Sequence, residues 1–434
     1  MKIGLFSDTY LPHANGVAVC VHTLKKGLEE LGHDVYVITC NNSMKLSVED
    51  KVIKLPSFLL KDFYNYSVTG PFHFSAFNEI RKLKLDIIHI HTEFGTAILG
   101  RILAKTLGIP LVYTYHTMLE DYVHYINFMN IDILNKPFVK FVEMISKMYC
   151  YPANTVIVPS KKTYDVLMKY AIKNTDVRVL PSGIDLNIFK NPNQANIEKL
   201  REEFDLKGKK VLMYLGRVAK EKNIEIILET IKNRKDIILL VVGEGPELKY
   251  FKEKYDLENI IFCGKKEYHE VPDYYSLADA FISASTSETQ GLTFIEAMST
   301  GKILFCSDRV VLKDLLFENE NGYFFESIEE LNEKIDIFYS LDSDKRKSMS
   351  NKSIEISEKY DLTLFIKKVE DIYKNNLGKI YRIQKIKLNK DGSFKVYVRN
   401  RSYRVSKELF NKLELKINNK IDKSTLNIIR ENKI

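Results

Sequence analysis

Two acidic side chains lie on either side of a glycine turn in the second half of the chain. Glu288 follows an apolar run that predicts a strand, and Glu296 lies inside the helix predicted to come next. Gly291-Leu292-Thr293 begins that helix, where backbone N–H groups without intrahelical acceptors and the positive end of the dipole favour an anion. The segment therefore offers carboxylates for sugar hydroxyls and a phosphate site between them. Paired carboxylates are also typical of glycoside hydrolases.

Two cations follow another apolar run. Gly216-Arg217 and Lys222-Asn223 lie in a loop directly after the predicted strand 210–216. The planar fork of Arg and the point charge of Lys can hold a diphosphate without a metal, although such a loop is often only a solvated charge run. Gly243 ends the predicted strand 236–243, and the turn after it lets backbone approach a ligand closely. Cations beside a helix N-terminus that can bind phosphate indicate that the ligand is a nucleotide-sugar rather than a free glycan.

The N-terminal part carries weaker signals. Asn15-Gly16-Val17 follows the predicted strand 2–6 and begins a helix, but it is neither a Gly-x-Gly-x-x-Gly fingerprint nor a Walker loop, and an ordinary turn fits equally well. His116 follows the predicted strand 110–115, a position where a structural histidine is common. His89 and His91 lie on one strand face, but because no third ligand is visible, packing and local hydrogen bonds are favoured over a metal.

The elements that must position these residues fall into two sets. Short apolar runs alternate with helical stretches, which is typical of parallel sheets covered on both faces. The sequence therefore predicts an α/β protein with two doubly wound domains, residues 1–180 and 181–376, joined near Pro181-Ser182-Gly183. Residues 343–373 read as helices that pack back across the join. The predicted strands are residues 2–6, 34–39, 86–91, 110–115 and 155–160 in the first set, and 210–216, 236–243, 259–264, 279–285 and 302–306 in the second.

Composition and charge exclude several classes of protein. Of the 434 residues, 45% are hydrophobic and 28% charged, which excludes a disordered chain. No apolar run is long enough to span a membrane, and the five scattered cysteines show no zinc or redox spacing. From Asn375 onward the chain contains 16 Lys and Arg and five Asp and Glu, a net charge of +11. The tail therefore accounts for more than the whole chain's net charge of +8. Residues 377–434 are predicted to form a small basic β-rich appendage with a hairpin at Asp391-Gly392.

Together these motifs resemble the retaining glycosyltransferases of family 4, which have the two-domain GT-B fold. The family's Glu-x7-Glu element matches Glu288 and Glu296, and its Gly-Arg-x4-Lys-Asn element matches Gly216 to Asn223. The resemblance implies that Arg217 and Lys222 hold the donor diphosphate, Glu288 contacts the sugar and Glu296 contacts the ribose. It also implies donor-binding roles for further residues, in part through their backbone: Asn15, Gly16, Val17, Gly216, Gly243, Gln290, Gly291, Leu292 and Thr293.

A second block resembles the bacterial 1,2-diacylglycerol 3-alpha-glucosyltransferases. It comprises Tyr113-Thr114-Tyr115-His116-Thr117 and Glu120-Asp121-Tyr122-Val123-His124-Tyr125, and it implies that His116 is the active-site histidine near the donor sugar. Residues 136–149 predict a basic amphipathic helix, which suits a membrane interface or, alternatively, a core-facing helix with a solvated Lys face. The residues expected on the acceptor or membrane side are Tyr10, Tyr122, His124, Lys136, Lys140 and Lys147.

The resemblance implies transfer of glucose from UDP-glucose to 1,2-diacylglycerol, with retention. We expect no tightly bound cofactor and no metal requirement, and we expect a cytoplasmic protein peripherally attached to the anionic inner face of the membrane. The alternatives are a family-4 transferase with another sugar or acceptor, such as a mannosyl- or galactosyltransferase, and a nucleotide-sugar epimerase. Nucleic-acid binding is disfavoured for the nearly neutral main body, although the tail's charge also suits it.

Overall fold

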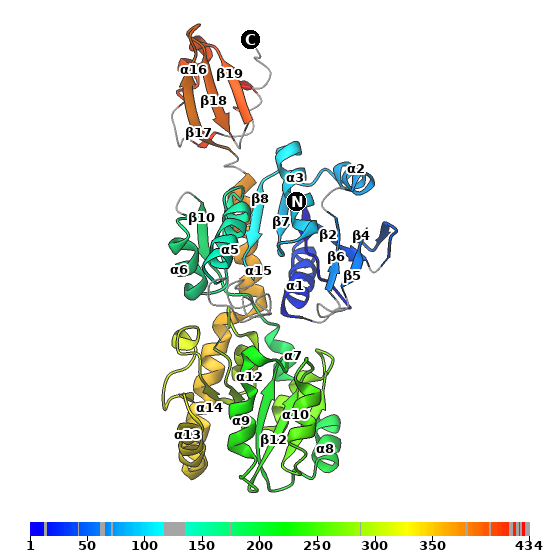
Figure 1. The fold of residues 1–434 in the computed structure, drawn as a ribbon, viewed down its shortest axis with the longest axis vertical. Helices are drawn as coiled ribbons and strands as arrows, with labels where there is room; N and C mark the ends of the chain where they lie inside the picture. Colours follow the sequence, from blue (N-terminus) through cyan, green and yellow to red (C-terminus); the bar gives the residue numbers. More distant parts are fainter. Residues whose placement is uncertain are drawn as a thin grey trace.

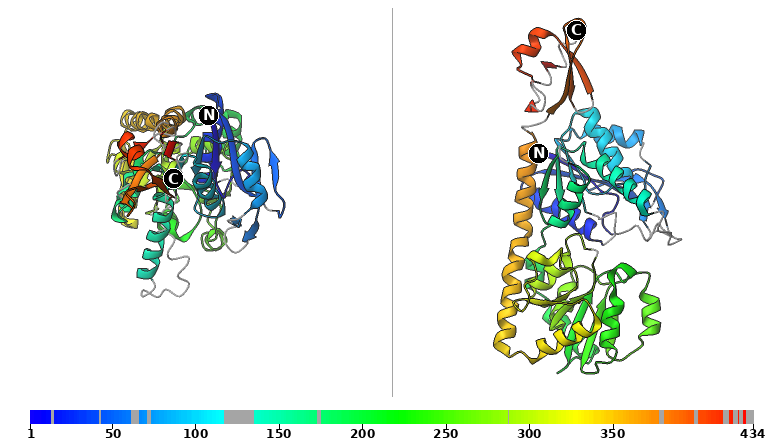
Figure 2. Two further views of the ribbon diagram at one scale, coloured as in Figure 1. Left: turned by 90° about the horizontal axis from the view of Figure 1, so that it is seen from above. Right: turned by 60° about the vertical axis from the view of Figure 1, so that its left-hand side comes forward.

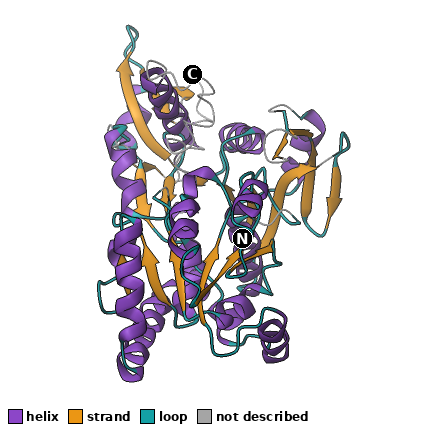
Figure 3. Cartoon of the chain, turned by 60° about the horizontal axis from the view of Figure 1, so that its bottom comes forward, coloured by secondary structure: helices purple, strands orange, loops and turns teal. Residues whose placement is uncertain are grey.

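The computed structural model describes residues 1–12, 15–41, 43–60, 66–70, 73–116, 135–172, 175–286, 288–377, 381–398, 401–415, 420–421, 425 and 428–429. The chain forms two α/β lobes, one above the other in Figure 1, and a small β-rich module beyond the first lobe. Figure 3 shows the strands of the two lobes lying between helices. This is the α/β architecture predicted from the sequence.

The first lobe is built on an eight-stranded sheet with the order β10-β9-β8-β7-β1-β2-β4-β3, parallel except for β3. Successive residues of its strands point to opposite faces: Ile87 packs in one apolar core and Ile88 in the other. A separate hairpin pairs β5 (Phe58–Leu60) with β6 (Tyr66–Val68). The strands of the sheet are β1 (Lys2–Phe6), β2 (Asp34–Asn41), β3 (Ser47–Glu49), β4 (Val52–Pro56), β7 (Ile87–Ile90), β8 (Leu111–Thr114), β9 (Thr155–Val158) and β10 (Asp176–Val179).

Helices with local start signals cover this sheet. Asn15 caps the helix that begins at Gly16, and Ser160 caps the helix that begins at Lys161, each accepting a hydrogen bond from a backbone N–H in the first turn. The helices of the lobe are α1 (Gly16–Glu30), α2 (Phe74–Lys82), α3 (Gly95–Leu107), α5 (Asn135–Cys150) and α6 (Lys161–Lys169). Within the described residues, no helix is long and apolar enough to cross a membrane.

The second lobe holds a six-stranded parallel sheet with the order β13-β12-β11-β14-β15-β16. Numbered from its own first strand, this is the 3-2-1-4-5-6 order of dinucleotide-binding folds, whose ligands bind where the order reverses, between β11 and β14. The strands are β11 (Lys210–Leu215), β12 (Ile237–Val242), β13 (Ile260–Gly264), β14 (Ala280–Ser283), β15 (Ile303–Cys306) and β16 (Gly322–Phe324). The ten predicted strands are all present, most of them a residue or two shorter than predicted.

Helices and short 3-10 turns complete the second lobe. The helices are α7 (Leu186–Lys190), α8 (Gln194–Glu203), α9 (Ile224–Ile231), α10 (Leu248–Lys254), α11 (Val271–Leu277), α12 (Leu292–Ser299), α13 (Ile328–Ser340) and α14 (Ser343–Ser357). The 3-10 turns are η3 (Lys220–Lys222), η4 (Leu312–Asp314) and η5 (Glu358–Tyr360).

Of residues 343–373, predicted as helices that pack back across the join, only the last long helix, α15 (Leu362–Leu377), returns to the first lobe; α14 packs against α12 of the second lobe. Ile366 packs beside Gly27 of α1 so closely that a Cβ at Gly27 would lie 1.9 Å from Ile366 Cδ1. Glu370 of the same helix accepts a hydrogen bond from His33 at 2.9 Å. Figure 2 shows α15 running along one side of the first lobe toward the small module. The chain therefore crosses between the lobes twice, which ties them together.

The small module is a four-stranded antiparallel sheet with the order β19-β18-β17-β20. Its first hairpin turns at Lys390-Asp391-Gly392, where Gly392 has a φ of 80°, which confirms the predicted hairpin. A small core of Val396, Val398, Val405, Leu415 and Ile429 stabilises it. The elements are β17 (Tyr381–Leu388), β18 (Phe394–Val398), β19 (Arg401–Val405), α16 (Lys407–Lys412) and β20 (Lys420–Ile421).

Candidate active site

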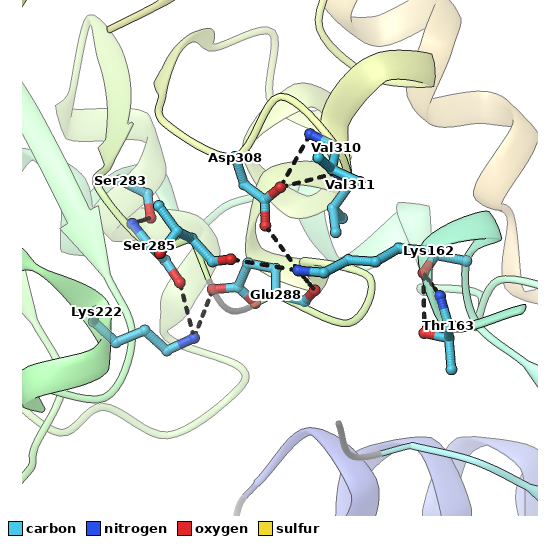
Figure 4. Close-up of polar contacts among 11 residues, drawn as sticks. Lys162, Thr163, Lys222, Ser283, Ser285, Glu288, Asp308, Val310 and Val311 are labelled. Carbon is cyan, nitrogen blue, oxygen red and sulfur yellow. Dashed lines mark hydrogen bonds and ion pairs between the residues drawn. The ribbon is translucent and has the colours of Figure 1, made fainter. Parts of the chain in front are cut away.

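The predicted donor residues meet at the point where the strand order of the second sheet reverses. The loop after β11 carries Arg217 and Lys222, and the loop after the adjacent β14 carries Glu288. Lys222 Nζ donates to Glu288 Oε1 at 2.6 Å and to Ser285 Oγ at 3.3 Å (Figure 4). Residues 66 positions apart in sequence thus form one ion pair. Both side chains are largely buried, so the pair is shielded from water and salt.

The surroundings of the two glutamates shift their pKa values in opposite directions. Burial opposes ionisation of Glu288, but Lys222 outweighs it and holds the pKa of Glu288 below its ordinary value. Glu296 is buried in α12, and burial raises its pKa to about 7 although Tyr275 donates to it at 3.2 Å. Glu288 is therefore an ionised acceptor, whereas Glu296 carries a proton part of the time near neutral pH. Both suit hydrogen bonding to hydroxyl groups of a ligand.

Arg217 is positioned by a carboxylate of its own loop. Its guanidinium forms a close ion pair with Glu221, whose side chain is buried. The hydroxyl of Tyr214 donates to the carbonyl oxygen of Arg217 at 2.9 Å, which fixes the backbone at the strand end. A guanidinium held in this way is preorganised for a planar, bidentate contact with phosphate oxygens.

Glycines allow the loops at the carboxyl ends of the second sheet's strands to pack closely. A Cβ at Gly243 would lie 1.9 Å from the carbonyl oxygen of Gly216, so the loops after β11 and β12 touch through their main chains. Gly291 precedes α12 with a φ of 75°, which favours glycine, and a Cβ there would lie 2.3 Å from Phe294 Cδ2. Leu292 and Thr293 follow as the first residues of α12. Their N–H groups stand at the positive end of the helix, as the sequence predicts for an anion site.

The first lobe contributes its own strand ends. Asn15 begins α1 in an extended conformation, and its side chain accepts from the backbone of Ala18 at 2.9 Å, so no glycine is needed at this position. A Cβ at Gly16 would lie 3.9 Å from Leu292 Cδ1 of the second lobe. The Asn15-Gly16-Val17 loop therefore borders the start of α12, as the family resemblance implies.

Histidines follow two adjacent strands of the first sheet. His116 Nε2 lies 3.0 Å from His91 Nδ1, at hydrogen-bond distance, and their rings stack. Burial lowers the pKa of His116 to about 4 and that of His91 well below its ordinary value, so both rings are neutral at pH 7. His89 bonds to Tyr373 and Thr114, each at 2.7 Å, which confirms hydrogen bonding as its role. Within the described ranges, no three His, Cys, Asp or Glu side chains gather as a metal site requires.

Other predicted residues lie elsewhere. Tyr10 is buried in the first lobe with its hydroxyl 3.1 Å from His22 Nδ1. Both ends of the Gln290 amide bond to the backbone of Ser182, each at 2.8 Å, so this side chain joins the lobes. Lys140 of α5 is exposed and Lys147 pairs with Glu143. Tyr122, His124 and the side chain of Lys136 lie outside the described residues.

Four partners of the site were not singled out from the sequence: Glu221, Tyr275, Ser285 and Lys162. Glu221 stands four positions after Arg217 in the same loop, and its opposite charge so close in sequence is a signal that could have found it. Tyr275 and Lys162 reach their partners from other elements, and no local pattern marks them.

Comparisons with known proteins agree with this geometry. Residues 14–188 match the family model described as Glycosyltransferase Family 4, and residues 196–356 match the one described as Glycosyl transferases group 1. The chain is 38% identical over 341 residues to an alpha-monoglucosyldiacylglycerol synthase of Streptococcus pneumoniae, covering 75% of each chain. It is 33% identical to a protein of the same name from Acholeplasma laidlawii, covering 87% of this chain and 98% of that relative.

Solved structures show the same fold. A sucrose-phosphate synthase from Thermosynechococcus elongatus superposes with a TM-score of 0.71 at 20% identity, covering 86% of this chain and 98% of that one. Anabaena Alr3699/HepE, solved with UDP and glucose, superposes with a TM-score of 0.66 at 18% identity, covering 86% of this chain and all of that one. Two Rossmann-like lobes with the donor-type loops of the second lobe define a glycosyltransferase of the GT-B fold. The chain belongs to glycosyltransferase family 4.

Proposed function

We propose that the protein transfers glucose from UDP-glucose to the free hydroxyl of 1,2-diacylglycerol, with retention of configuration, forming alpha-monoglucosyldiacylglycerol. The observation that carries the proposal is the buried Lys222–Glu288 pair at the reversal point of the second sheet, beside Arg217 and the start of α12. A cation for phosphate and an ionised carboxylate for sugar hydroxyls stand together there. The names of the two relatives support the glucosyl group and the lipid acceptor.

In this proposal the protein acts chiefly on the leaving diphosphate. Arg217, Lys222 and the first N–H groups of α12 stabilise the negative charge that develops on UDP as the glycosidic bond breaks. Glu288 accepts hydrogen bonds from the sugar and Glu296 from the nucleotide ribose. Neutral His116 lies just beyond the carboxyl end of β8 and serves as a hydrogen-bond partner near the donor sugar. The departing phosphate helps to remove the proton of the attacking hydroxyl on the same face of the sugar.

Helix α5 supports an approach from the membrane. Val142 and Tyr149 of this helix are buried, but Phe141 is 50% exposed and Met144 58% exposed, and Met148 lies one turn further on and is also exposed. The helix therefore presents a second, outward apolar stripe beside the exposed Lys140. Apolar side chains next to a cation are the features by which a helix lies in a lipid interface.

The basic module supports attachment to anionic lipid. Lys387 of β17 lies directly opposite Lys395 of β18, which in turn lies opposite Arg404 of β19. Arg404 is paired with Asp391 of the same module. Lys387 and Lys395 are like charges opposite one another, an arrangement that destabilises a sheet and that a bound anion would relieve. Basic residues near an anionic leaflet contribute about 1 kcal/mol each to binding.

The test is an assay of the purified full chain with diacylglycerol vesicles and a panel of UDP- and GDP-sugars. The expected product is a monoglucosyl lipid formed from UDP-glucose, with an α-linkage identified by the anomeric coupling in its NMR spectrum. Efficient transfer only from another donor, or only to another acceptor, contradicts the proposal. Interconversion of nucleotide-sugars without an acceptor would make the protein an epimerase instead.

A further inference from the structure

Lys162 belongs to the first lobe, but its ammonium group lies among the loops of the second (Figure 4). It is the second residue of α6, close behind strand β9. Its Nζ donates to the carbonyl oxygens of Thr286 at 3.3 Å and Glu288 at 3.2 Å, and to Asp308 Oδ2 at 3.4 Å. A lysine ammonium has three N–H groups, so these contacts occupy all of them.

Asp308 is arranged to receive this cation. It lies just after β15, and only 4% of its side chain is exposed. Its Oδ1 accepts from the backbone N–H groups of Val310 at 3.1 Å and Val311 at 3.0 Å, which orients Oδ2 toward Lys162. A buried carboxylate needs a charged or hydrogen-bonding partner, and here the charged partner comes from the other lobe. The contact therefore differs from an exposed surface ion pair.

The loop that carries Glu288 is held from two lobes at once. Lys222 of the second lobe binds the Glu288 carboxylate, and Lys162 of the first lobe binds its main-chain carbonyl. Two residues further on, the amide of Gln290 forms paired hydrogen bonds with Ser182 at the join between the lobes. The position of the Glu288 side chain therefore depends on where the first lobe lies.

We propose that Lys162 is a positioning residue that couples closure of the two lobes to alignment of the donor loop. When the lobes separate, the loop loses its Lys162 contacts and Glu288 loses its support on the main-chain side. When they close, Lys162 and Asp308 lock the loop in the conformation that receives the sugar. Donor binding and closure then favour each other, because such linkage is reciprocal. This inference rests on the proposed donor role of Glu288.

The experiment compares Lys162→Ala, Lys162→Arg and Asp308→Asn with a matched control, Lys161→Ala. Lys161 is the adjacent residue, half exposed and paired with Asp165 of its own helix. We expect Lys162→Ala to lower kcat and UDP affinity about tenfold each, in keeping with loss of charge-assisted hydrogen bonds. Lys162→Arg restores part of both, and Lys161→Ala matches wild type. The double variant of Lys162→Ala and Asp308→Asn is no worse than the poorer single variant, because the Lys162–Asp308 contact that Asp308→Asn weakens is already lost in Lys162→Ala.

Small-angle X-ray scattering gives the readout that a purely structural role would not change. UDP, or GDP if the panel identifies a GDP-sugar donor, should reduce the radius of gyration of wild type and Lys161→Ala but not of Lys162→Ala. The inference is overturned if Lys162→Ala contracts like wild type, or if wild type does not contract at all. It is also overturned if Lys162→Ala loses activity only in proportion to lost thermal stability. Scattering and nucleotide binding need no lipid, so a different acceptor would refute the proposed function while leaving this test intact.

Discussion

Replacing Glu296 by glutamine should make the protein more stable and a poorer enzyme. Burial raises the pKa of Glu296 to about 7, whereas its ordinary value is 4.5. Below pH 4.5 the carboxyl is protonated in both the folded and the unfolded chain. As the pH rises from there toward 7, the unfolded chain releases this proton and the folded protein keeps it. The free energy of unfolding therefore falls across this window.

The size of the effect follows from the shift. The pKa is raised by about 2.5 units, and each unit corresponds to about 1.4 kcal/mol. The free energy of unfolding of the wild-type protein should therefore fall by roughly 3 kcal/mol between pH 4.5 and pH 8. Glutamine is neutral, has a similar shape and can still accept a hydrogen bond from Tyr275. Glu296→Gln should therefore match wild type near pH 4.5 and exceed it increasingly above that, by roughly 6–12 °C in melting temperature for a domain of this size.

The assay is differential scanning calorimetry of both proteins without nucleotide between pH 4.5 and 8.5, following the transition of the second lobe. Glu320→Gln, at an exposed turn position, is the control for the Glu-to-Gln substitution itself. UDP affinity by titration calorimetry completes the test, with roughly tenfold weaker binding expected because an amide replaces the carboxyl group that contacts the ribose. A constant stability difference across the pH range would refute the reasoning that Glu296 is held protonated. Unchanged UDP affinity would refute its contact with the ribose.

Four further predictions follow from the same geometry. Arg217→Ala should raise the activation free energy of transfer by about 2.7–4 kcal/mol. The variant Lys220→Ala, at an exposed neighbouring residue, should leave it unchanged. Near-normal turnover of a folded Arg217→Ala protein would contradict the diphosphate role. Activity should persist in excess EDTA, because protein cations and the start of α12 supply positive charge for the diphosphate; abolition by EDTA with rescue by a divalent ion would be the opposite result. Burial lowers the pKa of His116 to about 4, so stability should fall as the pH drops below its ordinary 6.5, and His116→Asn should flatten that slope in denaturant titrations. Truncation after Leu377 should weaken sedimentation with anionic vesicles and flatten its salt dependence while activity on detergent-dispersed diacylglycerol is kept; equal vesicle binding would exclude a membrane role for the module.

The local elements and their order along the chain are encoded by short-range patterns of residues. Strands buried on both faces read as continuous apolar runs, so five strands of each sheet could be predicted from residues close together in the chain. Because ligands bind where a strand order reverses, loops after predicted strands were the right places to look for Arg217, Lys222 and Glu288. The turn at Gly392 and the start of α12 at Gly291 are equally local, since each depends on the conformation of a few consecutive residues.

How these elements contact one another depends on residues far apart in the chain. Gln290 stands in the donor motif, yet its amide bonds to Ser182, 108 positions away, because the loop folds against the join. Helix α15 follows the second lobe in sequence but packs on α1, where Gly27 leaves room for Ile366. The contact between Lys162 and Asp308 spans 146 positions and two lobes. Such contacts arise where surfaces from distant parts of the chain pack closely, and neither residue periodicity nor motif spacing predicts them. The residues that support the site could therefore be identified only from the three-dimensional structure.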